Sequence, residues 1–314
     1  MSMGARVLGL HLGLLALLFA LQFVLPAYHH GNLARIMVLA SYAVGYNIMF
    51  GYTGLLSLGH ALFFAAGMYG MALTVQYAGF TPAPALVAGI VAGALVAGGL
   101  ALLALRTAGV AFMIVTLMFA QAGYYAILYF GEYTRGDEGF VIRQAQRVLW
   151  GIDLSDATNR YFAAWVLFSA CLLTCLWLVR APFGKTLIAI RENEERVRML
   201  GYDTFAHKLA AMVISGVISA AAGASYGLLF GNTGASFASV QYSILPLLYV
   251  LLGGAGTVVG PFVGTLFMFY LIDLSSGVTS AYMLIAGVAL VLLTLFAPQG
   301  LTGELRRRLW KGLP

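Results

Sequence analysis

Long apolar runs separated by short polar connectors dominate this chain of 314 residues. The runs are continuous rather than alternating, and most have about 20 residues, the length with which an α-helix crosses the hydrocarbon core of a bilayer. A membrane β-barrel, whose strands alternate between apolar and polar residues, is therefore excluded. The pattern predicts an all-α polytopic membrane protein with about ten transmembrane helices in a single domain, 1–314. The runs lie at approximately 7–25, 33–50, 58–78, 84–105, 108–130, 161–179, 209–230, 243–259, 262–276 and 281–297.

One long polar segment, residues 180–208, interrupts these runs. Its apolar residues recur at helical spacing with charged residues between them, which is typical of an amphipathic helix at a protein surface. Pro182 suits the first turn of a helix, and Gly201 suits the position just past the end of one. We therefore expect one or two short helices outside the bilayer that dock to another protein. The alternative is a solvated connector between two spanning helices.

The basic residues predict the orientation, because cytoplasmic loops of membrane proteins carry an excess of Lys and Arg. The 180–208 segment and the C-terminal tail are both rich in them, and four expected spans between the two place both in the cytoplasm. The same count places the N-terminus in the cytoplasm and the 131–160 loop outside. The N-terminal run resembles a signal peptide, but it is long and lacks a small-residue cleavage site, so we expect a retained first span.

Composition agrees with this pattern, since 61% of the residues are hydrophobic and only 9% are charged. Soluble domains carry about 25% charged residues, so there is no room for a separate soluble domain. The formal net charge of +6 comes from basic loop ends and does not indicate a nucleic-acid partner. Cys171 and Cys175 lie one helical turn apart without a nearby His or acid, so we expect small buried hydrophobes rather than a disulfide or metal site.

Two glycine-rich stretches, residues 51–60 and 253–261, break the helical pattern at membrane depth. Irregular backbone is tolerated there only where protein or a water-filled cavity satisfies its polar groups, and such breaks in two halves of a chain point to an inverted-repeat transporter. The halves would be 33–130 and 209–297. Polar residues favour a pathway at 51–60, whereas close packing of small residues explains 253–261 equally well. The candidate path residues are Tyr52, Thr53, Gly54, Ser57, His60, Gly253, Gly254, Gly256 and Thr257.

Acidic residues are nearly absent from the expected spans. Residues 1–131 contain no Asp or Glu, and residues 204–303 contain only Asp273. Proton- and ion-coupled carriers commonly place carboxylates within their spans, so this argues against such a carrier. Catalytic and metal-binding motifs are also missing, and residues 183–186 lack the preceding glycine and strand of a phosphate-binding loop. We expect no enzyme and no metal site, and we expect His60 to pack between helices or to line a pathway.

Four groups of residues resemble the permease subunits of branched-chain amino acid ABC importers, in particular the LivM-like branch. The similarity covers roughly residues 35–300, and the groups follow one another in the family's order. One departure is Arg135, which stands where the family often has a second glycine. The matching residues are the run 51–61 with Phe63, Phe64, Gly67 and Tyr69; the run 134–139; Arg180, Pro182, the runs 183–185 and 189–194, Leu200 and Gly201; and the run 252–257 with Gly260 and Pro261.

The resemblance implies a permease subunit in the bacterial inner membrane. It would work with a second related permease, two cytoplasmic ABC ATPase subunits and a periplasmic solute-binding protein. ATP and Mg²⁺ would bind to the ATPases, with no cofactor in this chain. The helices of the 180–208 segment would couple to an ATPase, and the 131–160 loop would face the binding protein. The coupling residues would be Phe183, Gly184, Lys185, Arg191, Glu192, Asn193, Glu194, Leu200 and Gly201, and the loop residues Thr134, Gly136, Asp137 and Glu138.

The solute implied by the resemblance is a branched-chain or another small amino acid. A path lined by Tyr52, Thr53, Ser57 and His60 would offer hydrogen bonds without a fixed charge. Permeases with the same resemblance also serve urea, amides and other small polar solutes, and the residues leave these alternatives open. A stand-alone channel or secondary carrier is a different class of alternative. Such a protein would not need docking helices at 180–208 and would transport when expressed alone.

Overall fold

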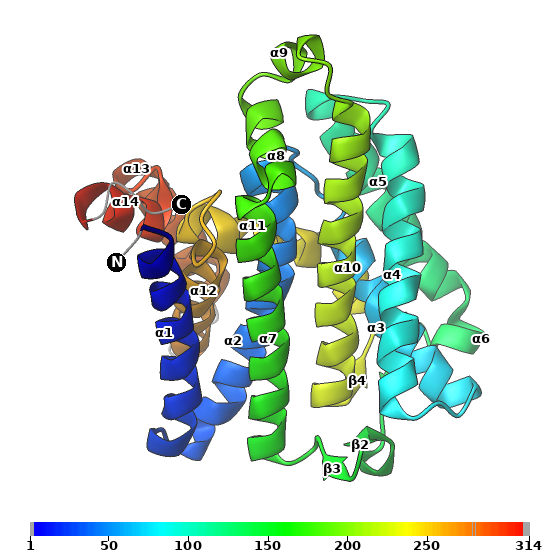
Figure 1. The fold of residues 1–314 in the computed structure, drawn as a ribbon. Coiled ribbons are helices and arrows are strands. Elements are labelled where there is room, and N and C mark those ends of the chain that lie inside the picture. The colour runs from blue at the N-terminus through cyan, green and yellow to red at the C-terminus, as the bar shows by residue number, and fades with distance from the viewer. Residues whose placement is uncertain (1–2, 278, 280, 310–314) are drawn as a thin grey trace.

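The computed structural model describes residues 3–277, 279 and 281–309 as a bundle of helices with two very short antiparallel sheets (Figure 1). Each expected apolar run contains one of the longer helices. These are α1 (Met3–Val24), α2 (Ala27–Asn47), α3 (His60–Tyr77), α4 (Pro82–Ala104), α5 (Gly109–Tyr129), α7 (Ala157–Arg180), α10 (Thr204–Phe230), α11 (Val240–Gly253), α12 (Gly260–Ser276) and α13 (Tyr282–Phe296).

Shorter elements fill the connections between these helices. A π-helical turn, η1 (Ile48–Tyr52), continues α2, and the remaining helical elements are α6 (Gly131–Thr134), η2 (Gln144–Arg147), α8 (Pro182–Glu192), α9 (Glu194–Met199), η3 (Ala235–Ala238) and α14 (Gly300–Leu309). The strands are β1 (Phe140–Val141), β2 (Val148–Leu149), β3 (Ile152–Asp153) and β4 (Asn232–Thr233).

Among the described residues, six helices are long and apolar enough to cross a membrane: α1, α2 with η1, α4, α5, α7 and α10. The apolar helices α11, α12 and α13 are shorter, and α3 is not among the six. The count of ten spans is therefore not confirmed. α11, α12 and α13 are too short, with 14, 17 and 15 residues, whereas α3 has 18 residues but is not apolar enough. The two glycine-rich stretches are not α-helical, so that α3 begins only at His60 and α12 only at Gly260.

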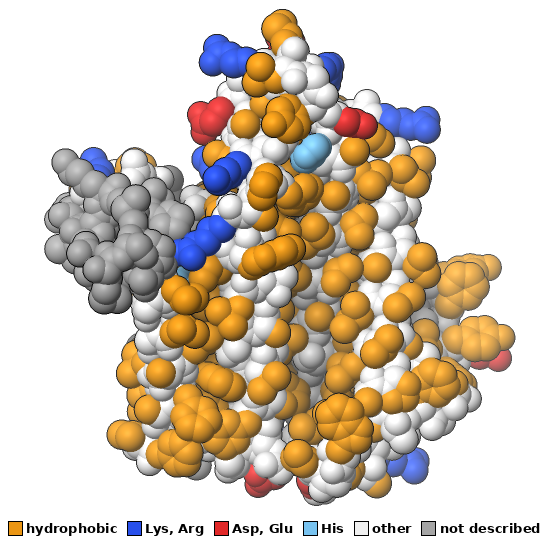
Figure 2. All heavy atoms as spheres, in the orientation of Figure 1, with side chains coloured by type: hydrophobic (Ala, Val, Ile, Leu, Met, Phe, Trp, Pro, Cys, Tyr) orange, Lys and Arg blue, Asp and Glu red, His pale blue; other side chains and the backbone are white. Residues whose placement is uncertain are grey.

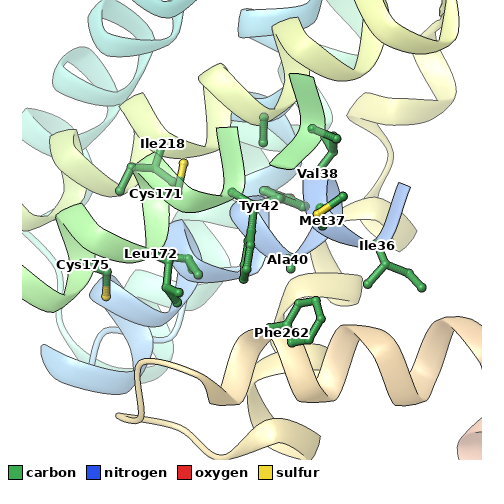
Figure 3. Close-up of a cluster of buried hydrophobic side chains, with 14 of the residues drawn as sticks. Ile36, Met37, Val38, Ala40, Tyr42, Cys171, Leu172, Cys175, Ile218 and Phe262 are labelled. Atoms are coloured by element: carbon green, nitrogen blue, oxygen red, sulfur yellow. The ribbon is translucent and has the colours of Figure 1, made fainter. Parts of the chain in front are cut away.

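The centre of the bundle is α2. Of the most apolar stretch of α2, 89% is buried inside the protein, compared with 17% for the corresponding stretch of α5. The burial of α2 is high because α7, α10, α11 and α12 pack around it. Figure 3 shows Tyr42 of α2 among side chains of α7, α10 and α12, including Leu172, Ile218 and Phe262. Hydrophobic side chains cover the sides of the molecule in Figure 2, as expected of helices that face lipid.

Glycines allow α3 and α10 to approach each other closely. A Cβ on Gly67 would lie 2.1 Å from the carbonyl oxygen of Ala220, and a Cβ on Gly223 would lie 2.0 Å from that of Phe64. Neither separation is possible for a real side chain. Small residues at the contact between apolar helices are the usual way in which membrane helices gain van der Waals packing.

The 131–160 loop and the α8–α9 pair lie at opposite ends of α7, which has 24 residues and is about 36 Å long. Figure 1 shows α9 at one end of the bundle and the β2–β3 hairpin at the other. The loop is fixed to the end of α10, because β1 pairs with β4 in the register Phe140↔Thr233. The predicted two-sided arrangement of these segments is therefore present, while their assignment to cytoplasm and periplasm stays a prediction.

The inverted repeat also stays a prediction. The first break follows α2, the first helix of the half 33–130, whereas the second break follows α11, the second helix of the half 209–297. The two breaks therefore do not occupy equivalent places in the order of helices.

Candidate functional site

The two glycine-rich breaks lie side by side and share one buried side chain. The Nδ2 group of Asn47, the last residue of α2, donates to the carbonyl oxygen of Thr257 at 2.9 Å, and its Oδ1 accepts from the N–H of Gly256 at 2.9 Å. A Cβ on Gly51 would lie 2.5 Å from the Gly256 nitrogen. The two backbones can meet because neither residue has a side chain. We call Asn47, Gly51, Arg191, Gly256 and Thr257 the junction.

Arg191, in the last turn of α8, enters the junction from the docking helices. Its Nη1 donates to the carbonyl oxygen of Gly51, and it lies 3.1 Å from where a Cβ on Gly256 would be. The last carbonyl groups of a helix need partners outside it. In this structure Arg191 supplies one for the π-helical end of α2. The sequence assigned Arg191 to the coupling surface, and the structure directs its guanidinium to both breaks.

α14 closes the other side of the second break. Thr302 donates from Oγ1 to the carbonyl oxygen of Gly253, and its hydroxyl lies 2.9 Å from that of Thr257. A cavity of about 580 Å³ opens next to Arg191 between the second break and α14. Its lining residues are Arg191, Leu251, Ala255, Gly256, Thr257, Pro298, Gln299, Gly303 and Arg307. The second break therefore borders a cavity that could hold solute at the α8–α9 end.

His60, the first residue of α3, is fully buried. Its Nε2 lies 2.7 Å from Oγ of Ser215, and that hydroxyl donates to the carbonyl oxygen of Gly45 at 2.6 Å. Because the Ser215 proton points to Gly45, Nε2 must carry the hydrogen of the His60 ring. Nδ1 then lacks a partner among the described residues. In this conformation His60 packs between α2, α3 and α10, and its role in a path stays a prediction.

The other residues of the first break divide between the junction and the interior. Thr53 donates to the Ile48 carbonyl oxygen, and Oγ of Ser57 accepts from the Gly59 N–H. Tyr52, Thr53 and Ser57 are buried, whereas Gly54 is exposed beside the stem of Arg191. Of the predicted path residues, Gly54 and Gly256 lie against the Arg191 side chain, and Gly256 and Thr257 are hydrogen-bonded to Asn47. Ser57 and His60 form their side-chain hydrogen bonds elsewhere, with Gly59 and Ser215.

Several predicted coupling residues hold the α8–α9 pair in place or cap its helices, rather than forming its exposed surface. A Cβ on Gly184 would lie 2.3 Å from the Leu178 carbonyl oxygen, so this glycine seats α8 against the end of α7. Phe183 stacks on His207 of α10 with ring centroids 5.6 Å apart. Oδ1 of Asn193 accepts from the N–H of Arg196 and caps α9. Gly201 ends the pair with φ at 89°, a left-handed conformation that favours glycine.

The exposed surface of the pair combines charged and apolar side chains. Lys185 and Glu192 are exposed, while Met199 and Leu200 at the far end have 84% and 71% of their surface exposed. We call Met199 and Leu200 the apolar tip. Leu200 was among the coupling residues predicted from the sequence, whereas Met199 was not. The signal would have been two large apolar residues just before the helix-ending glycine of a charged segment.

Glu194 fastens α9 to α10 through Nζ of Lys208, and Nη2 of Arg198 lies 3.3 Å from its carboxylate. Burial acts to raise the pKa of Glu194, but the Lys208 hydrogen bond and the nearby positive charges outweigh it, so the pKa lies below its ordinary value of 4.5. The stability contributed by Glu194 is therefore fully present above that value and is lost as the pH falls through the lowered pKa.

Glu194→Gln is expected to remove this pH dependence. Acidification from neutral pH should lower the thermal stability of the purified wild-type chain more than that of the variant. The control is Glu195→Gln, since Glu195 is exposed and forms no ion pair among the described residues. An equal loss of stability on acidification in wild type and Glu194→Gln would contradict the assignment.

The predicted loop residues form an ordered turn at the opposite end. Oγ1 of Thr134 donates to the Ile127 carbonyl oxygen at 2.6 Å and accepts from the Gly136 N–H. Arg135 has φ at 58°, in the left-handed region that favours glycine, at the position where glycine is often found in proteins with this motif. Asp137 and Glu138 follow with exposed side chains. The turn presents two carboxylates outward, and their contact with a binding protein stays a prediction.

The comparisons with known proteins give consistent findings. The family described as branched-chain amino acid transport system / permease component matches residues 30–296. The LivM permease protein of the high-affinity branched-chain amino acid transport system of Salmonella typhimurium is 28% identical over 300 residues, covering 87% of this chain and 69% of the relative. The Escherichia coli K12 protein of the same description is 29% identical with the same coverage.

A shorter match is the autoinducer 2 import system permease protein LsrC of Photorhabdus laumondii, which is 29% identical over 119 residues, covering 36% of this chain and 34% of the relative. No solved structure matches the chain.

Proposed function

This chain belongs to the branched-chain amino acid transport permease family, and from that premise we propose that it is a permease subunit of an ATP-driven importer for branched-chain or other small amino acids. The LivM proteins, similar over most of the chain, support this solute class. In this proposal a second related permease completes the path, two ABC ATPases supply the energy, and a periplasmic binding protein delivers the solute. ATP and Mg²⁺ bind to the ATPases.

The observation that carries the proposal is the junction. Arg191 connects α8 directly to Gly51 of the first break, and Asn47 connects the first break to Gly256 and Thr257 of the second. Displacement of α8 by a partner would therefore change both breaks together. Movement of one packed element against another is a common way to switch a transporter between two states. A channel or carrier that works alone would have no use for this connection.

The apolar tip supports an ATPase as the partner of α8 and α9. Exposed apolar residues with charged neighbours are typical of protein interfaces, whose centre is apolar and whose rim is polar. In Figure 2 charged side chains gather around this end of the molecule, whereas the sides are covered by hydrophobic ones. The α8–α9 end is then cytoplasmic, and the turn with Asp137 and Glu138 faces the binding protein.

Co-purification from membranes tests the proposal. The tagged chain is expected to capture an ATPase and a second permease. Leu200→Asp is expected to lose the ATPase and keep the second permease, because it places a charge at the centre of the ATPase contact. The control is Trp150→Asp, which changes an even more exposed apolar residue of the β2–β3 hairpin at the opposite end and should keep both partners. A chain that purifies alone and moves solute in vesicles without ATP would be a channel or carrier.

A further inference from the structure

Arg35 is a charged residue in the most deeply buried helix of the protein. Every other residue from 33 to 49 is buried, and Arg35 alone in that stretch is exposed. Although α7, α10, α11 and α12 pack around α2, Arg35 is thus the one side chain of this stretch that they leave uncovered. No acidic side chain forms an ion pair with it among the described residues. Charged residues within membrane spans are costly and are commonly kept for a function.

A second guanidinium group lies beside the same aromatic ring. Phe230 is the last residue of α10, and its ring centroid lies 5.2 Å from Cζ of Arg35 and 5.7 Å from Cζ of Arg160, near the start of α7. One ring therefore holds cations from two different helices by cation–π contacts. The two like charges repel each other, so the site is incomplete without a negative charge.

Arg147 adds a third cation. Burial, followed by the charge of Arg160, lowers the pKa of Arg147, and its guanidinium lies next to Gly231, the residue after Phe230. The Nε groups of both Arg147 and Arg160 are buried, and neither has a hydrogen-bond partner in the described chain. Unpaired buried N–H groups of cations are expensive. They point to an acceptor that this chain does not itself provide.

Asp153 does not neutralise the cluster of three cations formed by Arg35, Arg147 and Arg160. Its carboxylate accepts hydrogen bonds from Gln144 at 2.8 Å and from the Ser155 N–H at 2.8 Å, and these bonds lower the pKa of Asp153. It acts on Arg147 only through its charge. Of the three guanidinium groups around Phe230 and Gly231, only that of Arg147 is acted on by this carboxylate, which is already hydrogen-bonded elsewhere. The Arg160 guanidinium has a neutral partner instead, because its Nη2 donates to the Ser155 carbonyl oxygen at 2.8 Å. The surplus positive charge favours a bound anion.

An aromatic wall continues from the cluster into the bundle. Tyr226 lies 4.7 Å from Phe230, Phe237 lies 5.2 Å from Tyr226, and Tyr242 lies 5.0 Å from Phe237, between ring centroids. The wall leads on to Tyr42, which donates to the Tyr242 carbonyl oxygen. Such a surface is apolar enough for an aliphatic side chain and begins beside the cations.

We propose that Arg35, Arg147 and Arg160 bind the carboxylate of the transported amino acid at the end of the bundle that carries the 131–160 loop, with its aliphatic side chain against the aromatic wall. Guanidinium groups hold carboxylates through short, charge-assisted hydrogen bonds. This inference rests on the proposed function. It also assigns the solute a charged contact, which a path of Tyr, Thr, Ser and His would lack.

The test uses the complete importer in proteoliposomes, with leucine uptake and ATP hydrolysis stimulated by the binding protein measured in parallel. Arg35→Gln is expected to lower leucine uptake per ATP hydrolysed at least about tenfold, the lower end of the range for losing one charge-assisted hydrogen bond. Arg35→Lys should recover part of it. The matched control is Arg143→Gln, an exposed cation of the 131–160 loop, which should leave the ratio unchanged.

Unchanged uptake in Arg35→Gln would overturn the proposal. An equal fall in uptake and in stimulated ATP hydrolysis would also overturn it, since Arg35 would then serve the docking of the binding protein. If the wild-type complex takes up no amino acid, the proposed function is wrong, and the carboxylate site, which rests on it, is wrong as well.

A labelling experiment distinguishes these cases without transport. Phe230→Cys, made in the assembled complex, should react faster with an anionic thiol reagent than with a cationic one. Arg35→Gln should reduce that preference, and leucine should protect the thiol while leucinol, which lacks the carboxylate, should not. Equal reactivity with both reagents, or equal protection by both solutes, would refute a carboxylate site.

Discussion

Arg191→Leu is expected to reduce solute uptake by the assembled importer about tenfold to a hundredfold, the range for one charge-assisted hydrogen bond. ATP hydrolysis and assembly should persist. The variant keeps the apolar tip, so the ATPase can still dock, but Gly51 loses the partner of its carbonyl group and α8 loses its connection to the breaks. Arg191→Lys should be intermediate, because an ammonium group can reach one acceptor without the planar fork of a guanidinium.

The measurement is uptake and ATP hydrolysis in the same proteoliposomes, so that coupling is read as their ratio. The control is Arg106→Leu, which removes an exposed cation from the turn between α4 and α5. If the ATPase no longer co-purifies with Arg191→Leu, Arg191 belongs to the docking surface, as the sequence suggested. If the ratio stays at the wild-type value, the junction does not transmit movement.

Asn47→Leu is expected to destabilise the chain by about 1–3 kcal/mol, because two partly buried backbone groups each lose a hydrogen bond worth about 0.5–1.5 kcal/mol net. These groups are the Thr257 carbonyl and the Gly256 N–H. The second break should then separate from the first. The readouts are a lower Tm of the purified complex and a gain in thiol reactivity in an Ala255→Cys background, within the second break.

Ser41→Ala is the matched control for this variant. Ser41 is also buried in α2, but its hydroxyl donates to the Met37 carbonyl oxygen of the same helix, so its loss should cost less than about 1 kcal/mol. Equal Tm values for Asn47→Leu and Ser41→Ala would mean that Asn47 does not hold the breaks together.

Local sequence patterns were enough to predict the longer helical elements, because the signals for a helix lie within the helix and at its ends. Continuous apolar runs predicted the longer helices, and glycine-rich stretches predicted the two breaks. Pro182 and Gly201 marked the start of α8 and the end after α9. Each of these features depends on the conformational preferences of a few neighbouring residues.

Which of these elements contact one another depends on packing between segments that are distant in the chain. Asn47 and Gly256 are 209 residues apart in the chain. Nothing in the local sequence around either residue indicates that the two are hydrogen-bonded. The direction of the Arg191 guanidinium is likewise invisible in a charged helix, whose pattern places Arg on the exposed face. Arg35 looks like an isolated polar residue in an apolar run until the surrounding helices bury its neighbours. Contacts between distant segments follow from packing of the whole bundle, so only the fold could assign these three residues.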